Sequence, residues 1–335
     1  MRNGTIQALK FLAFLAVGIL LLWLAFRKVD TSKFITDLKE ANYYWLLLSV
    51  LFGFFAFVSR SRRWILLIHP LGYKPSLKNS FYALMTGYLA NLALPRLGEI
   101  TRCVALGKKE KIPVDQLIGT VVVERSVDLI SLMIIMLFLI FSSSDQVGLF
   151  LKNSILIPIQ KMFGATWIIW VAFILFLFAA VTLFLLVRYK NSLRKFRFFS
   201  KIFDVTRGVV NGLKTITNME KKWEFVFHTI FIWLNYALMT WVVVFSLKST
   251  SFLTFHDSIF ILVIGGIGMS APVSGGIGAF HYIVQQGLYI VKGIPLVDGF
   301  AYATLTHESQ LVFVVITGAI SFFIIFRKDR KETPS

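Results

Sequence analysis

Residues 117–141 read LIGTVVVERSVDLISLMIIMLFLIF, an apolar run interrupted by three charged side chains. A helix needs about 20 apolar residues to cross the roughly 30 Å hydrocarbon core of a bilayer, so this run predicts a transmembrane helix. The three charges are Glu124, Arg125 and Asp128. Because an unpaired charge at membrane depth costs roughly 2.5–3.5 kcal/mol on insertion scales, these groups must pair with one another, with a neighbouring helix, or with water in a cavity.

The composition of the whole chain extends this prediction beyond one helix. Of the 335 residues, 57% are hydrophobic and only 16% are charged, and the mean hydropathy is +0.74. The 34 phenylalanines and 8 tryptophans suit the apolar core and the aromatic belts of a bilayer. Water could not solvate this much apolar surface, so we expect an all-α polytopic membrane protein with a single transmembrane domain over 1–335.

Several other apolar runs approach the length of a span, which gives six full transmembrane helices in all. The further five are 8–26, 45–58 with its flanks, 166–187, 223–247 and 299–326. The first is followed by Arg27 and Lys28 and not by a small-residue cleavage site, which predicts an uncleaved helix. Two more apolar stretches are irregular, because 79–95 is short and ends in a proline and 258–290 is broken by a proline and several glycines.

Lysine and arginine outnumber acidic residues by 35 to 17, a formal net charge of +18. The basic residues lie between the apolar runs and not along one polar domain, which argues against a nucleic-acid partner. Cytoplasmic loops typically carry such an excess, so we assign the basic linkers and both termini to the cytoplasm. These linkers are 59–78, 96–116 and 188–222, together with the tail from Arg327, whereas 142–165 and 247–257 are poor in charge and are expected outside. The linker 188–222 further predicts a basic amphipathic helix on the anionic inner leaflet.

The two irregular stretches each lie between linkers assigned to the same side of the membrane. Because 59–78 and 96–116 are both basic, 79–95 should enter and leave on the cytoplasmic side. Because the spans that flank 258–290 run in opposite directions, that stretch should enter and leave on the outside. The sequence therefore predicts two re-entrant hairpins that open to opposite faces. The alternative is that one or both are ordinary spans, since the charge rule is statistical.

The two irregular stretches also resemble each other in plan. Each is an apolar segment broken by proline or glycine and followed by a span with ionisable groups inside its apolar run. We therefore expect an inverted repeat of two halves, 8–141 and 166–326, with substrate bound at their junction. A chance resemblance is the alternative, because the match is one of pattern and not of residue identity.

Basic residues near the first irregular stretch provide a means to bind an anion, because arginine offers a planar fork of donors that matches phosphate. The arginines concerned are Arg60, Arg62, Arg63, Arg96 and Arg102, with Glu99 in an early turn of the helix after Pro95. Together with Glu124, Arg125 and Asp128 they predict a polar cavity wall that meets a lipid headgroup. The alternatives are positive-inside anchoring and a structural ion-pair cluster near the cytoplasmic interface.

The second irregular stretch contains a glycine-rich loop, Ser274-Gly275-Gly276-Ile277-Gly278, after Pro272 and Val273. Its backbone N–H groups could cradle a phosphate, or its glycines could merely permit a tight turn. In the last span, His307 and Glu308 suit proton coupling because histidine titrates near neutrality, with a helix-packing hydrogen bond as the alternative. No His-x-x-x-His pair occurs and Cys103 is the only cysteine, so we expect no metal site, no cofactor and no catalytic centre.

Taken together, the order and spacing of these motifs resemble one known family over roughly residues 10–326. The motifs are Arg60-x-x-Arg63-Trp64, then Pro95, Gly98, Glu99 and Arg102, then Glu124-Arg125-x-x-Asp128, then Pro272-x-x-Gly275-Gly276-x-Gly278. They are similar to the flippase-like family built on the membrane half of bacterial lysylphosphatidylglycerol synthetases.

The resemblance implies a lipid translocase that moves an anionic or aminoacylated phospholipid between the leaflets of a bacterial cytoplasmic (inner) membrane. We expect the residues named above to line a cavity that accepts the headgroup while the acyl tails stay in lipid. Two-part members carry a cytosolic domain that transfers lysine from tRNA to phosphatidylglycerol; this chain stops at Ser335, so we expect no enzyme activity. Two alternatives stay open, a non-transporting membrane partner of a lipid-modifying enzyme and an ion-coupled small-solute transporter. A second copy of the chain or a separate lipid-modifying enzyme is the expected protein partner.

Overall fold

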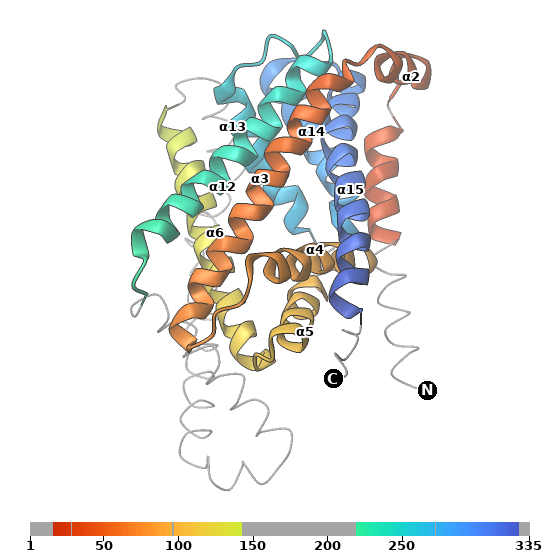
Figure 1. Cartoon of the computed structure of the whole chain (residues 1–335). Coiled ribbons are helices and arrows are strands. Elements are labelled where there is room, and N and C mark those ends of the chain that lie inside the picture. Colours follow the sequence, from red (N-terminus) through yellow and green to blue (C-terminus); the bar gives the residue numbers. More distant parts are fainter. Residues whose placement is uncertain (1–15, 28, 96, 143–218, 272, 328–335) are drawn as a thin grey trace, which may run out of the picture.

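The structure, a computed structural model, describes residues 16–27, 29–95, 97–142, 219–271 and 273–327, and no β-strand occurs among them. Four helical segments in these ranges are long and apolar enough to cross a membrane. They are α3 (Tyr43–Ile68) with the 3-10 turn η1 (His69–Leu71), α6 (Val114–Ser142), α12 (Lys222–Val243) with η3 (Val244–Ser246), and α15 (Leu296–Phe326) (Figure 1). The prediction of an all-α polytopic membrane protein is confirmed.

Four of the six predicted spans correspond to these segments. The first predicted span, 8–26, is described from residue 16 onward as an apolar helix, Ala16–Phe26. The predicted span 166–187, and the linker 188–222 as far as residue 218, lie outside the described residues.

Two stretches that we had assigned to linkers are helical. The span predicted at 45–58 continues as α3 to Ile68, so the arginines of 59–78 lie on a transmembrane helix. The linker predicted at 96–116 contains α5 (Leu97–Glu110), which buries Arg102, Cys103 and Leu106. Both corrections have one cause: charged side chains ended the apolar pattern in the sequence, but in the fold they are paired inside the bundle.

The helices α4 (Leu77–Ala93) and α5 form a hairpin whose two outer ends lie together. At that end the Glu110 carboxylate accepts hydrogen bonds from the Ser76 backbone N–H at 3.0 Å and from the Asn79 amide at 2.7 Å. Nearer the tip, Gly87 and Gly98 bring the two backbones into direct contact, and no side chain would fit between them. The chain therefore enters and leaves this hairpin at the end of the bundle where α3 ends and α6 begins (Figure 1). We call it the basic end, because Lys74, Lys108, Lys109 and Lys111 lie there.

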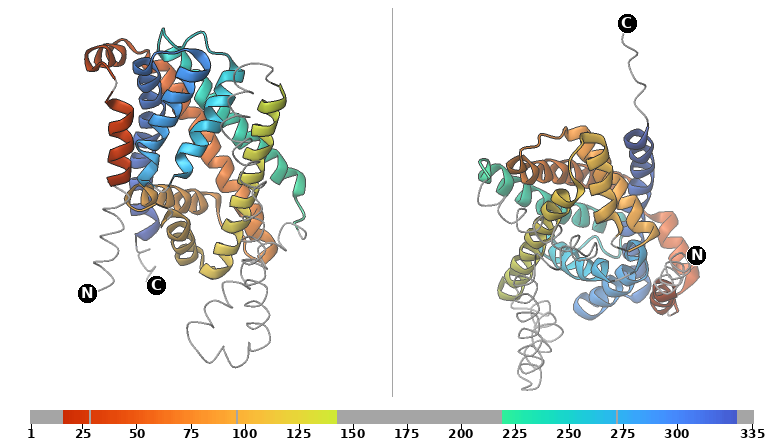
Figure 2. Two further views of the ribbon diagram at one scale, coloured as in Figure 1. Left: turned by 180° about the vertical axis from the view of Figure 1, so that it is seen from behind. Right: turned by 90° about the horizontal axis from the view of Figure 1, so that it is seen from below.

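The helices α13 (Phe255–Ser270) and α14 (Ala279–Lys292) form a second hairpin from the opposite end. The Asp257 carboxylate near the start of α13 lies 2.6 Å from the Lys292 ammonium at the end of α14. Between the helices, the 3-10 turn η4 (Ser274–Gly276) reverses the chain through positive φ angles of 61° at Gly275 and 76° at Gly276. The view from behind shows that the two hairpins enter the bundle from opposite ends (Figure 2, left).

The long helices hold the hairpins in place. α3 packs along α12, and α15 packs against both α4 and α14, so one long helix contacts both hairpins. The short helix α2 (Thr31–Glu40) lies at the end opposite the basic end, where Lys33 forms a 2.7 Å ion pair with Asp298 at the start of α15.

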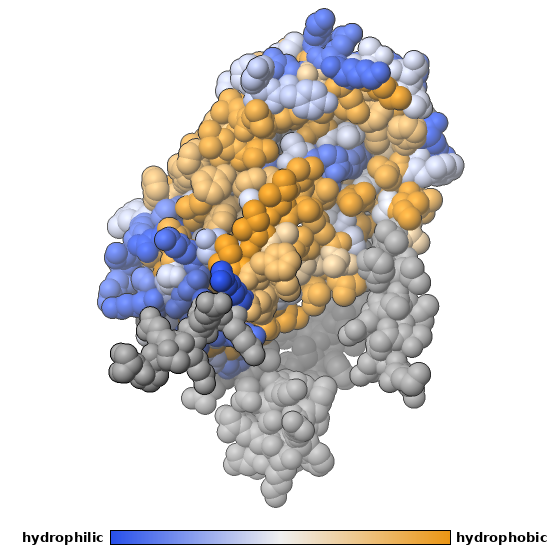
Figure 3. Space-filling view, turned by 45° about the vertical axis from the view of Figure 1, so that its right-hand side comes forward, coloured by the Kyte–Doolittle hydropathy of each residue, from blue (hydrophilic) through white to orange (hydrophobic). Residues whose placement is uncertain are grey.

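The outer surface is that of a protein in contact with lipid. Figure 3 shows a broad hydrophobic band with hydrophilic residues gathered at its two ends. Large apolar side chains such as Ile134, Phe141 and Phe323 are exposed on this surface, which water would not favour. Tyr44 and Trp223 are exposed near opposite ends of the bundle, as in the aromatic belts of membrane proteins.

Candidate functional site

A cavity of about 760 Å³ lies inside the bundle between the two hairpins. Its walls come from α3, α4, α5, α6, α12, α13, η4, α14 and α15, so both halves of the chain contribute. Its polar wall residues include Arg60, Tyr88, Asn91, Glu99, Arg125, Asp128, Tyr236, Thr306, His307 and Gln310. The rest of the wall is mostly apolar, and the volume falls within the roughly 300–1,000 Å³ typical of ligand sites.

Glu124 on α6 is the centre of an ion cluster on the basic side of this cavity. Its side chain is fully buried, with Arg60 Nε 2.8 Å from Oε1 and Arg102 Nη1 3.0 Å from Oε2. Arg63 and Arg125 lie 3.6 and 3.8 Å from the same Oε1. Arginines from α3, α5 and α6 therefore converge on one carboxylate, which explains how charges are tolerated at this depth.

One turn further along α6, Asp128 pairs with two of these arginines. Arg60 Nη2 donates to Asp128 Oδ2, and Arg63 Nη2 donates to Oδ1 at 2.5 Å. Arg60 also donates to the Tyr236 hydroxyl of α12 at 3.0 Å. These contacts tie α3, α6 and α12 together at the cavity wall.

The cluster carries more positive than negative charge. Its four arginines, Arg60, Arg63, Arg102 and Arg125, face only three carboxylates, those of Glu99, Glu124 and Asp128. One guanidinium charge is thus left without a matching carboxylate. Because opposite charges attract strongly where water is scarce, this wall favours an anion over a cation.

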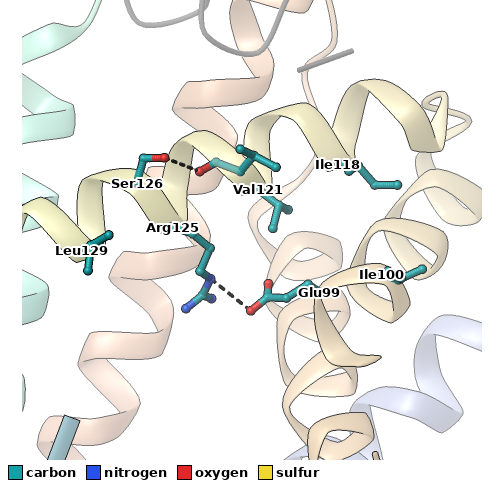
Figure 4. Close-up of a pocket in the computed structure, with 8 residues that line it drawn as sticks. Glu99, Ile100, Ile118, Val121, Arg125, Ser126 and Leu129 are labelled. Carbon is teal, nitrogen blue, oxygen red and sulfur yellow. Dashed lines mark hydrogen bonds and ion pairs between the residues drawn. The ribbon is translucent and has the colours of Figure 1, made fainter. Parts of the chain in front are cut away.

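The ion pair of Glu99 with Arg125 lies where the cavity meets the outside of the bundle. Arg125 Nε is 3.0 Å from Glu99 Oε1, and at 41% the Arg125 side chain is the most exposed of the four. A second hollow of about 360 Å³ lies on the other side of this pair, between α5 and α6. Figure 4 shows the two charged groups pointing toward each other between the helices, with apolar residues on both sides. These neighbours are Ile100, Ile118, Val121, Val122 and Leu129.

The opposite side of the cavity is closed by η4 and α15. The His307 ring faces η4, with Nε2 2.8 Å from the Gly275 carbonyl oxygen and Nδ1 3.1 Å from Glu308 Oε1. His281 of α14 lies beside both, with Nε2 3.6 Å from the same Glu308 oxygen. The His307 imidazole therefore lies on the wall opposite the arginine cluster, with His281 and Glu308 beside it.

The structure brings most of the sequence-predicted site residues to this cavity. Those that line it are Arg60, Glu99, Arg125, Asp128, Gly275, Gly276 and His307. Arg63, Arg102 and Glu124 lie directly behind the wall as partners in the ion cluster. Ser274, Gly278 and Glu308 are not part of the wall, and Arg96 lies outside the described residues.

Phosphate binding by the glycine-rich loop stays a prediction, because only part of its backbone is engaged within the turn. The N–H groups of Gly276 and Ile277 donate to the carbonyls of Val273 and Ser274 within the turn, so they are already engaged. Gly278, instead of facing the cavity, packs against the backbone of the first helix near Gly18. These glycines permit a tight turn, as the alternative interpretation held, and present the Gly275 carbonyl to His307.

Sequence reasoning missed Tyr88, Tyr236 and His281. The two tyrosines lie in apolar helices with no local motif, and only the fold places them on the wall. His281 had a signal that could have been used, because it stands three residues after the loop glycine Gly278, at the start of the returning helix.

This fold and cavity define a class: a polytopic helical membrane protein in which two helical hairpins from opposite ends enclose a cavity with an arginine-rich wall. The chain belongs to the family described as the lysylphosphatidylglycerol synthase TM region, whose model matches residues 11–318. The family predicted from the motifs is thereby confirmed.

Two relatives are similar in sequence to this chain over most of their length. UPF0104 membrane protein MJ1595 of Methanocaldococcus jannaschii is 25% identical over 327 residues, which are 91% of this chain and 92% of the relative. UPF0104 membrane protein MJ1078 of the same organism is 27% identical over 259 residues, 73% of this chain and 97% of the relative. No solved structure matches the chain.

Proposed function

We propose that this protein moves an anionic or aminoacylated phospholipid between the two leaflets of a cytoplasmic membrane. The observation that carries the proposal is the position of the Glu99–Arg125 pair, which borders both the interior cavity and a groove on the lipid-facing side. The family match is to the membrane region of a lipid-modifying synthase. The proposal is therefore transport, without aminoacyl transfer.

The headgroup occupies the interior cavity in this proposal. Arg125 is the most exposed arginine of the cluster and is held only by carboxylates that also have other partners, so a phosphate can compete for it. Arg60 stands in the same wall. The uncompensated positive charge supplies the attraction, and an arginine fork supplies the geometry for a phosphate.

The acyl chains remain outside, along the groove between α5 and α6. Its walls are the apolar side chains shown in Figure 4, and the charged pair lies at its inner edge. A phospholipid has the same division, with a charged head and apolar tails. A small solute has no need for an apolar groove leading out of its site, which favours a lipid over the small-solute alternative.

The hairpins are re-entrant in this proposal, and the basic end faces the cytoplasm. Charged contacts close each hairpin at its outer end, at Glu110 with Asn79 and at Asp257 with Lys292. The described chain ends at the basic end, where the Lys108 ammonium lies over the Phe326 ring (Figure 1), which supports a cytoplasmic C-terminus under the positive-inside rule.

A leaflet-exchange assay tests the proposal. The full chain is reconstituted into phosphatidylcholine vesicles with a trace of fluorescent phosphatidylglycerol, and dithionite quenches the label in the outer leaflet. We expect quenching to pass well beyond the outer leaflet. Arg125→Ala should slow the exchange about 10- to 100-fold, because hydrogen bonds to charged groups contribute roughly 1.5–3 kcal/mol.

Arg62→Ala is the matched control, since Arg62 lies on α3 and pairs with Glu224 without lining the cavity. Its exchange rate should equal that of the unchanged chain. Equal rates for Arg125→Ala and Arg62→Ala, with both variants folded, would contradict the site. No exchange of any phospholipid would contradict the function itself, and uptake of a solute or co-purification of an enzyme would then identify which alternative holds.

A further inference from the structure

His281, His307 and Glu308 form a cluster of side chains that the proposed headgroup binding does not use. Their potential ligand atoms all lie within 4.8 Å of one another, and among the described residues this is the one group of three His, Cys, Asp or Glu side chains so placed. Both imidazoles are buried, whereas the Glu308 side chain is 41% exposed. The cluster sits at the tip of the second hairpin, beside the cavity wall at Gly275 and His307.

The hydrogen bonds of His307 determine which ring nitrogen carries a proton. The Gly275 carbonyl can only accept, so at 2.8 Å the Nε2 of His307 must be the donor. In a neutral imidazole the other nitrogen, Nδ1, then presents a lone pair to Glu308 Oε1 only 3.1 Å away. A lone pair and a carboxylate oxygen repel at this distance unless a cation lies between them or beside them.

A proton on Nδ1 would satisfy this pair but leave the second imidazole unexplained. His281 Nε2 is 3.6 Å from the same Glu308 oxygen, and its Nδ1 is buried with no hydrogen-bond partner within the described part of the chain. A single proton bridges one nitrogen to one oxygen. A metal ion accepts all three ligand atoms at once.

We propose that His281, His307 and Glu308 bind a Zn²⁺ ion. Zinc takes histidine nitrogen at about 2.0–2.1 Å and carboxylate oxygen at about 2.0–2.2 Å in a tetrahedral arrangement, which places neighbouring ligand atoms about 3.3 Å apart. The observed separations of 3.1 and 3.6 Å lie on either side of that value. The hydrogen bond from His307 Nε2 to the Gly275 carbonyl is the outer-shell contact that orients most metal-binding histidines.

Two histidines and one glutamate leave a fourth position on zinc for an outside ligand. Because His307, Gly275 and Phe280 line the cavity, that ligand can reach the ion from the cavity. Zinc with one glutamate carries a net positive charge, so a phosphate oxygen is a suitable fourth ligand. This role rests on the proposed function, whereas the ion site itself does not.

Metal analysis of the purified full chain tests the site. The chain is stripped with a chelator, incubated with Zn²⁺, desalted and analysed for zinc, and the affinity is measured against a chromophoric chelator. We expect one ion per chain and at least a roughly tenfold loss of affinity in His281→Ala, His307→Ala and Glu308→Gln, since even outer-shell changes cost about 10–100-fold. His69→Ala, which removes a histidine at the basic end, should bind as the unchanged chain does.

Two further measurements test the zinc site independently of whether the variants fold. Co²⁺ in place of Zn²⁺ should give the visible absorption of a four-coordinate site in the unchanged chain, which requires no variant to fold. Zinc below one ion per two chains at saturation, or binding unchanged in all three variants, would overturn the site. Leaflet exchange measured on the stripped and the zinc-reloaded chain separates the two proposals: exchange by a chain that takes up no zinc on reloading overturns the metal site alone, and zinc uptake by a chain that moves no phospholipid overturns the transport function alone.

Discussion

Replacing Glu124 with glutamine perturbs the centre of the ion cluster with the smallest change of shape. The carboxylate is fully buried and lies 2.8 Å from Arg60 and 3.0 Å from Arg102. Glutamine keeps one acceptor oxygen, but its amide group then points two N–H donors at a guanidinium that also only donates. The cluster would hold four arginines against two acids.

The expected loss in the free energy of unfolding depends on which acidic partners the arginines keep. Removing one partner of a buried pair typically destabilises a protein by about 3–5 kcal/mol. Arg60 retains Asp128 and Arg102 retains Glu99, so neither is left without an acid. We therefore expect the lower part of that range, about 3 kcal/mol, and a fall of about 10 °C in the apparent melting temperature, given about 2–4 °C per kcal/mol for large domains.

Thermal unfolding of detergent-purified chains, followed by size-exclusion fluorescence, measures this change. Glu224→Gln is the matched control, because Glu224 pairs with Arg62 at 2.6 Å in a partly exposed position; about 1 kcal/mol or less is expected there. Adding Arg102→Met to Glu124→Gln restores the original charge balance and should recover part of the loss. Equal melting temperatures for Glu124→Gln and Glu224→Gln would refute the assignment of Glu124 as the centre of the cluster.

Two further predictions concern the hairpin and the helix at the opposite end. Gly98→Ala places a methyl group against the Gly87 carbonyl and 2.7 Å from the Asn91 side chain. We therefore expect the free energy of unfolding, followed by thermal unfolding, to fall by about 1–3 kcal/mol. Gly266→Ala is the control, because an added Cβ there meets only ordinary contacts at 3.7 Å, and it should be neutral or slightly stabilising. Burial, together with the negative charge of Asp298, raises the pKa of Asp37 on α2 above its ordinary 3.8. The folded chain thus binds this proton more tightly than the unfolded chain, and stability falls as pH rises from 3.8 through the raised pKa. Asp37→Asn should therefore raise the melting temperature at pH 7 and flatten its pH dependence in that window, and a lower melting temperature at pH 7 would contradict the reasoning.

Fold class and most spans could be predicted because bilayer thickness sets one length for every span and makes hydropathy informative. The ends of α3 and the whole of α5 could not. Arg60 and Arg63 end the apolar run in the sequence, yet their acidic partners on α6 are 64 to 68 residues away along the chain. A charge that is neutralised by a distant helix looks, within its own segment, the same as one that is solvated in a loop.

The same limit applied to the site. Ion-pair candidates were visible because ionisable residues inside an apolar run are rare, whatever their partners. The two wall tyrosines gave no such signal, since tyrosine is common in ordinary packed helices, and the signal for His281 was only its place three residues after Gly278. The loop glycines could be identified from the sequence, but their hydrogen bonds depend on how η4 turns, and that turn engages the N–H groups of Gly276 and Ile277.

The two hairpins are built alike, but the side chains at the two sides of the cavity between them differ in charge. Each is closed by a polar contact at its outer end and by glycine-backbone contacts nearer its tip: Gly87 meets Gly98 in the first, and Gly268 meets Phe280 in the second. The basic side of the cavity carries arginines paired with carboxylates from α3, α5 and α6, whereas two imidazoles and one carboxylate from α14 and α15 lie beside the tip of the second hairpin. Arginine stays charged at every physiological pH, so the basic side attracts an anion permanently.

The attraction at the other side depends on a proton or a metal ion, because two neutral imidazoles and one carboxylate carry no positive charge of their own. In the proposed transport, an anion that leaves the arginines finds a favourable place at the far side only when that cation is bound.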